Sequence, residues 1–407
     1  MKTLHDTLEK ALGKLPEQIF GQLLTRKLKV YGVKLSPRER QQLENIILSG
    51  ESKTLRLKRW CWWKRESIVL DFSEEEIQEI EQRLNEVAER VPQLIEDLSN
   101  QLSTDILGTL KQRWHGELRR QRREFARFNK HLSAHWGVPI ELLRMLLTIS
   151  REQGINLNQQ LRQAPPTDST HLVEVLTRLH ARACQVVDEI LVLLSAGFAD
   201  GAMARWRTLH EIAVIALFIG EHGDELAERY IWHQHVESRR AMRDYVACQE
   251  RLGYEPLESG EVADVERSYV AIVDRFGPSF GNQYGWATDQ LNNNNPTFAN
   301  IERAVGISHF RAHYRMASHN VHGNPKGVFF KLGLLEEADI LLAGPSNAGL
   351  ADPGHGAAIS LVQTSAPLAL LHPTFDNIVT LKIMLDLEAE IGQAFGDAHQ
   401  KLVDDVG

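Results

Sequence analysis

Two neighbouring segments in the middle of the chain have the composition of buried helices. Residues 171–196 carry apolar side chains at the three- and four-residue intervals of a helix face, and residues 200–219 end in an unbroken apolar run, Ile212–Ile219. A helix that is hydrophobic on all sides is buried in a larger core. The run is far shorter than the roughly 20 residues of a membrane-spanning helix. The sequence therefore predicts an all-α protein built around a long-helix bundle.

Length and composition predict a cytoplasmic protein of two or three units. The chain has 407 residues and only three cysteines, which are scattered and form no C-x-x-C pair. The N-terminal residues are amphipathic and include acids, unlike a signal peptide, so we expect no membrane attachment. Charge is uneven: residues 1–150 hold 26 Lys and Arg against 21 Asp and Glu, while residues 151–407 hold 20 against 33.

Local signals predict a division near residue 165. We expect residues 1–160 to form a helical N-terminal domain with a short β-hairpin near residues 54–72 and a basic helix over residues 104–136, which Gly137-Val-Pro139 ends. Residues 165–400 would form the bundle. Within it, residues 323–368 are rich in Gly, Pro and Ala and lack periodicity, which predicts an irregular excursion.

The N-terminal region carries two candidate nucleic-acid surfaces. Between Lys111 and Lys130 there are eight Lys and Arg against two Glu, and the hairpin tip combines three Trp with Lys and Arg. Aromatic side chains among cations are typical of single-strand binding platforms. A solvated helix face, a contact with the acidic half of another subunit, and a hairpin that packs its Trp inward are the alternatives. The candidate residues are Arg119, Arg120, Arg122, Arg123, Trp60, Trp62 and Trp63.

A second candidate site lies on the helix predicted over residues 308–322. Four side chains follow spacings of four, three and four residues and so share one face: Arg311, Arg315, Ser318 and His322. Arg315 and His322, two turns apart, can grip one phosphate, and the helix dipole favours a cation in the last turn. The alternative is a solvated or ion-paired helix end.

Glu211 requires a partner because it lies at the edge of the apolar run. Arg207 precedes it by four residues, so a structural Arg207–Glu211 pair is one interpretation. In the functional interpretation, Glu211 faces Arg315 or His322 across the bundle and orients it.

Histidine spacing also allows a metal site. His309 and His313 are four residues apart, with His319 and His322 close by. The Glu of a His-Glu-x-x-His motif is missing, and there is no Cys pair. We therefore expect no metal and no other cofactor. A metal enzyme that uses these histidines is the alternative, and it is the third interpretation of the chain.

Two motifs carry a resemblance to a known family. Arg205-Trp-Arg207-Thr-Leu-His-Glu211 and Tyr314-Arg315-x-x-Ser318-x-x-x-His322-Gly resemble the signatures of the bacterial helical domain of unknown function numbered 5677, over roughly residues 165–325. That family is similar to the HEPN superfamily of four-helix bundles, whose active members are metal-independent ribonucleases of toxin and phage-defence systems. Their signature is an Arg and a His separated by four to six residues on one helix.

The resemblance implies a HEPN-like endoribonuclease. Arg315, His322 and Glu211 would be catalytic, and the supporting residues would be Ser318, Arg207, His319 and Arg311. RNA, a second copy in a homodimer or higher homo-oligomer, and a partner protein such as an antitoxin would be the partners. Met316 stands where active members often have Asn, Asp or His. The alternative is therefore a non-catalytic sensor or scaffold that binds nucleotide, RNA or protein at the same face.

Overall fold

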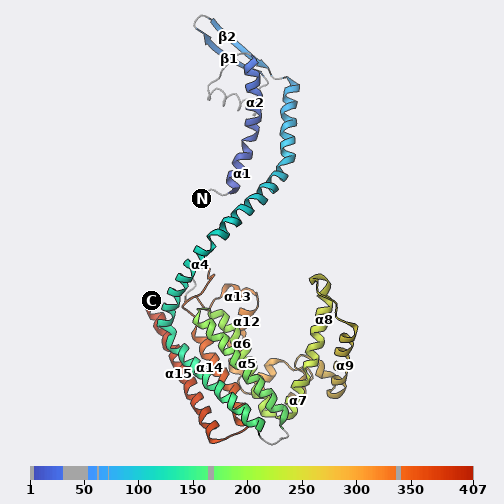
Figure 1. Cartoon of the computed structure of the whole chain (residues 1–407), viewed down its shortest axis with the longest axis vertical. Coiled ribbons are helices and arrows are strands. Elements are labelled where there is room, and N and C mark those ends of the chain that lie inside the picture. The colour runs from blue at the N-terminus through green and yellow to red at the C-terminus, as the bar shows by residue number, and fades with distance from the viewer. Residues whose placement is uncertain are drawn as a thin grey trace. The chain divides into compact units, whose positions relative to one another are not determined.

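The computed structural model describes residues 4–30, 54–61, 64–71, 73–163, 169–335 and 341–406. It divides into two compact units, residues 1–120 and residues 121–407 (Figure 1). Trp62 and Trp63 lie outside the described residues. No helix in these ranges is long and apolar enough to cross a membrane.

Unit 1 contains two short helices, a strand pair and the start of a long helix. The elements are α1 (Leu4–Gly13), α2 (Leu15–Val30), β1 (Thr54–Cys61), β2 (Lys64–Asp71) and the first part of α4 (Glu74–Gln163). The strands pair antiparallel, from Thr54 opposite Asp71 to Cys61 opposite Lys64. A capping box starts α4: Ser73 N–H donates to Glu76 Oε2 (2.9 Å), and Glu76 N–H donates to Ser73 Oγ (3.3 Å).

The prediction of a separate basic helix over residues 104–136 was wrong, because these residues are part of the longer helix α4. It is continuous through Gly137 and Pro139 to Gln163. A proline inside a helix costs about 3 kcal/mol. Trp136 and Leu143 are fully buried on either side of it, and burying each such side chain contributes about 1.5–3 kcal/mol. Tertiary packing therefore outweighs the local stop signal, and Trp136 Nε1–H also donates to Asn347 O (2.9 Å).

The last part of α4 belongs to unit 2, whereas we expected the division near residue 165. Its side chains Leu132, Leu146 and Leu147 are buried. Ser150 Oγ lies 3.0 Å from His180 Nε2 and 3.2 Å from Ser365 Oγ. These contacts join α4 to helices α5 (Thr170–Ser195) and α14 (Ala351–Leu370). Residues 121–163 are thus part of the helical core that the later helices complete.

Unit 2 is the predicted helical bundle. Its long helices α5 (Thr170–Ser195), α6 (Ala199–His222), α14 (Ala351–Leu370) and α15 (Phe375–Val406) lie side by side (Figure 1). The apolar end of α6 is buried as expected, with Val214 and Phe218 at 0% exposure. The other elements are α7 (Asp224–Trp232), α8 (Gln234–Leu252), α9 (Ser259–Phe276), η1 (Pro278–Gly281), η2 (Gly285–Ala287), α10 (Thr288–Leu291), α11 (Phe298–Ala304), η3 (Ser308–Phe310), α12 (Arg311–Val321) and α13 (Pro325–Phe329).

The prediction of an irregular excursion over residues 323–368 was wrong for its second half, which forms α14. This helix contributes buried residues on most sides, including Ala357, Ala358 and Leu361, so it shows no amphipathic period. Its glycines permit close packing. A Cβ at Gly354 would lie 2.2 Å from Phe395 Cζ.

Gly354→Ala is expected to destabilise unit 2 by about 1–3 kcal/mol, because the added methyl overlaps the buried Phe395 ring. Gly396→Ala is the matched control: its Cβ would meet nothing within 4 Å, and alanine is the better helix former by about 1 kcal/mol. Denaturant unfolding followed by helical circular dichroism measures both. Equal stabilities for the two variants would contradict the close packing of α14 on α15.

Acid is expected to destabilise unit 2 through His180. Burial lowers the pKa of His180 to about 4, whereas the unfolded side chain titrates near 6.5. Protons then bind the unfolded state more strongly, so stability is lost as pH falls below about 6.5, by about 2 kcal/mol at pH 5. Denaturant unfolding at pH 7.5 and pH 5 measures this loss. His180→Asn should lose about 2 kcal/mol less than wild type over that interval, and an equal loss would contradict the assignment.

Candidate functional site

Four polar side chains join α6 to α12. Arg207 and Glu211 lie one turn apart on α6, as Tyr314 and Ser318 do on α12. Arg207 donates from Nε to Ser318 Oγ (3.0 Å) and from Nη2 to Tyr314 Oη (2.7 Å), and it lies 3.1 Å from Glu211 Oε1. Tyr314 Oη–H in turn donates to Glu211 Oε1. We call these four residues the α6–α12 network.

The network holds Tyr314 as a hydrogen-bond donor. Burial and the hydrogen bond to Glu211 raise the pKa of Tyr314 well above its usual value. The Arg207 guanidinium lies 4.7 Å from the centre of the Tyr314 ring, which adds a cation–π contact. The side chains of Arg207 and Glu211 are 25% and 29% exposed, so the network reaches the surface. It fixes α12 on the bundle at an accessible edge.

A buried ion pair lies beneath the network. Glu302, which is 1% exposed, accepts from Arg311 Nη1 (3.1 Å) and lies 2.9 Å from His210 Nε2. Burial lowers the pKa of His210, and its Nδ1 has no partner among the described residues. His210 is therefore a neutral ring that donates from Nε2 to Glu302. Aromatic rings surround it: Trp206, Phe298, Phe310 and Tyr314.

Arg315 and His322, the expected catalytic pair, are both exposed. Within the described part of the chain, neither side chain has a hydrogen bond or an ion pair. His322 caps the end of α12, and its N–H still donates to Ser318 O (3.2 Å). Its Cα therefore stays on the helical path, on the face of Arg315 and about 10 Å further along the axis. The pair shares a face of α12 that is open to solvent.

The remaining predicted residues have other partners. Glu211 forms an ion pair with Arg207 and accepts a hydrogen bond from Tyr314, so the two residues of the structural interpretation are in contact. Arg311 binds Glu302. His319 Nδ1 accepts from Asn324 Nδ2 (2.9 Å), a contact that fixes the turn after α12.

The structure places the nucleic-acid candidates in separate elements. Trp60 lies in β1. Arg119, Arg120, Arg122 and Arg123 are exposed on α4, where Arg120 Nε–H donates to Glu117 (3.0 Å). No group of three or more His, Cys, Asp or Glu in the described ranges could hold a metal ion.

The comparison with protein families covers the helices that carry the network. Residues 173–339 match the sequence model of DUF5677, a family of unknown function. This confirms the family resemblance expected from the two motifs. No curated protein and no solved structure matches the chain. The DUF5677 region extends from α5 to beyond α13 and includes Arg207, Glu211, Arg315 and His322.

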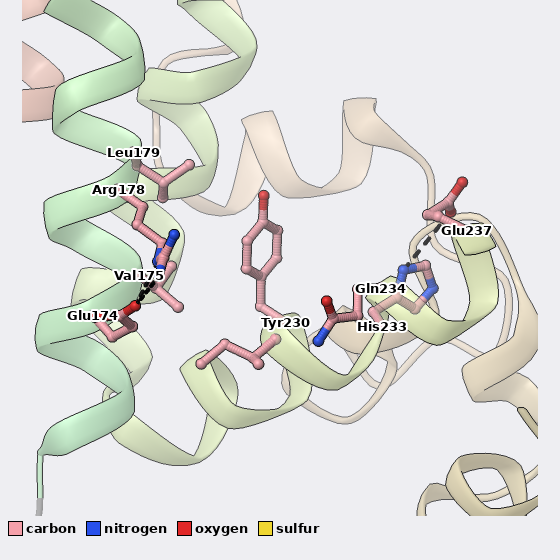
Figure 2. Close-up of a pocket in the computed structure, with 9 residues that line it drawn as sticks. Glu174, Val175, Arg178, Leu179, Tyr230, His233, Gln234 and Glu237 are labelled. Carbon is pink, nitrogen blue, oxygen red and sulfur yellow. Dashed lines mark hydrogen bonds and ion pairs between the residues drawn. The ribbon is translucent and has the colours of Figure 1, made fainter. Parts of the chain in front are cut away.

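Residues of the DUF5677 region line two hollows. One of about 590 Å³ lies between α5 and the α7–α8 turn, where Tyr230 stands between the Glu174–Arg178 and His233–Glu237 pairs (Figure 2). None of the predicted site residues lines it. A smaller hollow of about 170 Å³ borders α12 at Ala312, His313, Met316 and Asn320. It lies next to the face that carries Arg315.

Sequence reasoning missed three members of the site. His210 and Tyr314 stand inside the two motifs, but their roles depend on contacts with residues about a hundred positions away. Glu302 follows a capping box of Thr297 and Asn300 and had no local signal of burial. A glutamate is mostly exposed and is almost never fully buried unless it is paired.

Proposed function

We propose that unit 2 is a HEPN-like bundle that cleaves the RNA backbone without a metal, with Arg315 and His322 at the reacting phosphate. One observation carries the proposal. Glu302 neutralises Arg311 on α12, and Glu211 neutralises Arg207 on α6. In contrast, Arg315 and His322 are exposed and have no partner among the described residues. An unpaired cation and an unpaired imidazole on one face of a helix can both bind a phosphodiester.

The chemistry follows from the side chains. His322 acts as the general base that removes the proton of a ribose 2′-hydroxyl. The 2′-oxygen then attacks the phosphorus, and the P–O5′ bond breaks as the 5′-oxygen takes a proton from water, which gives a 2′,3′-cyclic phosphate and a 5′-hydroxyl. Arg315 stabilises the added negative charge on the phosphorane. The α6–α12 network contributes by holding α12 rigid, since positioning is a large part of such catalysis.

The same proposal includes assembly and biological setting. HEPN-like sites combine an Arg–His pair from each of two copies, so α12 would face α12 of a second copy across a two-fold axis. Such an enzyme would act as a toxin or phage-defence effector, and a partner protein such as an antitoxin would restrain it.

A second candidate function is binding without catalysis. Glu211, the expected supporting carboxylate, is occupied by Arg207 and Tyr314, and Met316 lines the small hollow beside α12. On this view the exposed face holds a nucleotide, RNA or protein and signals its presence.

One experiment distinguishes the ribonuclease from the binding protein. The purified full chain is incubated in EDTA with RNA and, separately, with DNA of the same sequence. The ribonuclease cleaves only the RNA, because DNA lacks the attacking 2′-hydroxyl. Binding to RNA with no cleavage would favour the second function, and equal cleavage of DNA would contradict the proposed chemistry.

A further inference from the structure

A third hollow, of about 410 Å³, lies between α12, α14 and α15. It adjoins the small hollow beside α12, because Met203, His313 and Asp352 line both. Residues at spacings of three and four, which place them on one face of each helix, line it from α14 and α15: Asp352, His355 and Gly356 on α14, and Phe395, Gly396 and His399 on α15. The volume is within the range of about 300–1,000 Å³ of small-molecule sites.

Three polar side chains at this hollow have no partner within the described part of the chain. His313, Asp352 and His399 come from three different helices, are exposed, and form no hydrogen bond or ion pair there. His355 is already engaged, because its Nε2 lies 3.3 Å from Glu388 Oε1. A neutral imidazole offers one N–H donor and one acceptor nitrogen, and a carboxylate offers acceptors. The hollow therefore presents both donors and acceptors to a ligand.

Aromatic rings form the floor of the hollow. Phe310 is half-buried, so part of its ring stays accessible, whereas Trp206 and Phe395 are 2% and 0% exposed. α14 comes this close to the Trp206 ring because residue 356 is glycine: a Cβ there would lie 2.7 Å from Trp206 Nε1. A flat ring in the hollow would meet aromatic surface on its face and polar groups along its edge.

These features match an unpaired nucleobase. Proteins that read single-stranded RNA stack its bases on aromatic or histidine side chains and form hydrogen bonds to the base edges. A metal ion does not fit, since no three His, Cys, Asp or Glu of the described residues gather closely enough to hold one. The hollow also lies near the face of α12 that would hold RNA phosphate. Met316, which lines the adjoining small hollow, directly follows Arg315.

We propose that this hollow receives one base of an RNA strand whose phosphate lies at Arg315 and His322. The inference rests on the proposed function and adds the part of the substrate that gives sequence preference, because phosphate contacts carry no sequence information. α14 and α15 lie beyond residues 173–339, which match DUF5677. Base recognition is therefore assigned mainly to helices that the family match does not include.

Binding of RNA hexamers by the full chain tests the proposal without cleavage. The hexamers carry 2′-fluoro groups, so no attacking hydroxyl is present, and matched base-free hexamers keep every phosphate but lack all bases. Fluorescence anisotropy should give a dissociation constant about 5–100-fold lower for the hexamer with bases, the usual effect of one stacked base. Equal affinities for the two hexamers would overturn the proposal.

Gly396→Leu tests whether the base enters this hollow. A Cβ at Gly396 meets nothing within 4 Å, so the leucine occupies open space without straining α15. The variant should bind the hexamer with bases at least about fivefold more weakly than wild type and bind the base-free hexamer equally well. Wild-type affinity of Gly396→Leu for both hexamers would contradict the assignment.

Gly260→Leu is the matched control. Gly260 is an exposed glycine on α9 whose Cβ also meets nothing within 4 Å, and it lines neither the third hollow nor the small one. This variant should bind both hexamers as wild type does. Circular dichroism checks that both leucine variants keep their helices.

His399→Ala tests the polar groups without filling the hollow. The side chain is exposed and has no partner among the described residues, so its removal should leave the fold unchanged. The variant should bind the hexamer with bases about 2–10-fold more weakly, the effect of one lost hydrogen bond, and should reduce the differences in affinity among hexamers of A, C, G and U. Arg315→Ala should instead weaken both kinds of hexamer to the same degree, because it removes a phosphate contact. Unchanged affinities for all four hexamers in His399→Ala would overturn the assigned polar contact.

Two results separate this inference from the proposed activity. If Arg315→Ala weakens binding while Gly396→Leu and His399→Ala bind every hexamer as wild type does, the base site is overturned and the proposed activity is unaffected. If the hexamers bind as expected but unmodified RNA stays intact in EDTA, the base site is supported and the proposed cleavage is contradicted.

Discussion

Replacing His322 with alanine is expected to lower the rate of RNA cleavage by about 10²–10⁴-fold, the usual contribution of a general acid or base. The exposed side chain has no partner within the described part of the chain, so its removal should leave the fold unchanged. The loss should therefore appear in kcat at an unaltered melting temperature. Cleavage of a labelled RNA under single-turnover conditions measures it.

His309→Ala is the matched control for this variant. His309 is also an exposed histidine near α12, but it lies in η3, against the Phe310 ring. Its removal should leave the rate within about twofold of wild type. Equal losses in the two variants, or full activity in His322→Ala, would remove His322 from the mechanism.

Glu302→Ala is expected to destabilise unit 2 by about 3–5 kcal/mol, the usual effect of removing one partner from a buried pair. The change leaves His210 with no acceptor for its Nε2 proton and Arg311 without its counter-ion. Both Glu302 and the His210 side chain are 1% exposed, so water does not replace the lost carboxylate. The free energy of unfolding from a denaturant titration measures the effect.

Two further variants distinguish the effect of losing the Glu302 carboxylate from the effect of any substitution in α11. Glu302→Gln keeps an acceptor for His210 and loses only the charge, so its destabilisation should be clearly smaller. Arg303→Ala changes the exposed neighbour and should stay within about 0.5 kcal/mol of wild type. If Glu302→Ala were as stable as Arg303→Ala, the buried pair would have no role in holding α12.

The sequence predicted the bundle helices where periodicity was strong. The ends of α5 were predicted to within one residue because its apolar face is long and regular. Continuity of α4 through Pro139 was missed, because burial of Trp136 and Leu143 is a tertiary effect that local stop signals do not contain. α14 was missed because a helix buried on most sides has no apolar face to detect.

The candidate site was predictable in part. The Arg207–Glu211 pair follows from a four-residue spacing on one helix. The partners that complete it, Tyr314 and Ser318, are more than a hundred residues away, and no spacing rule joins them. The same limit applies to Glu302 and His210, whose pairing depends on how α11 packs against α6.

The chemical form of the new RNA ends tests the central claim most directly. Mass spectrometry of the products formed in EDTA should find a 2′,3′-cyclic phosphate on one fragment and a 5′-hydroxyl on the other. These ends require attack by the 2′-oxygen, the step assigned to His322 and Arg315. Fragments that carry a 5′-phosphate and a 3′-hydroxyl would show attack by water and would contradict the account.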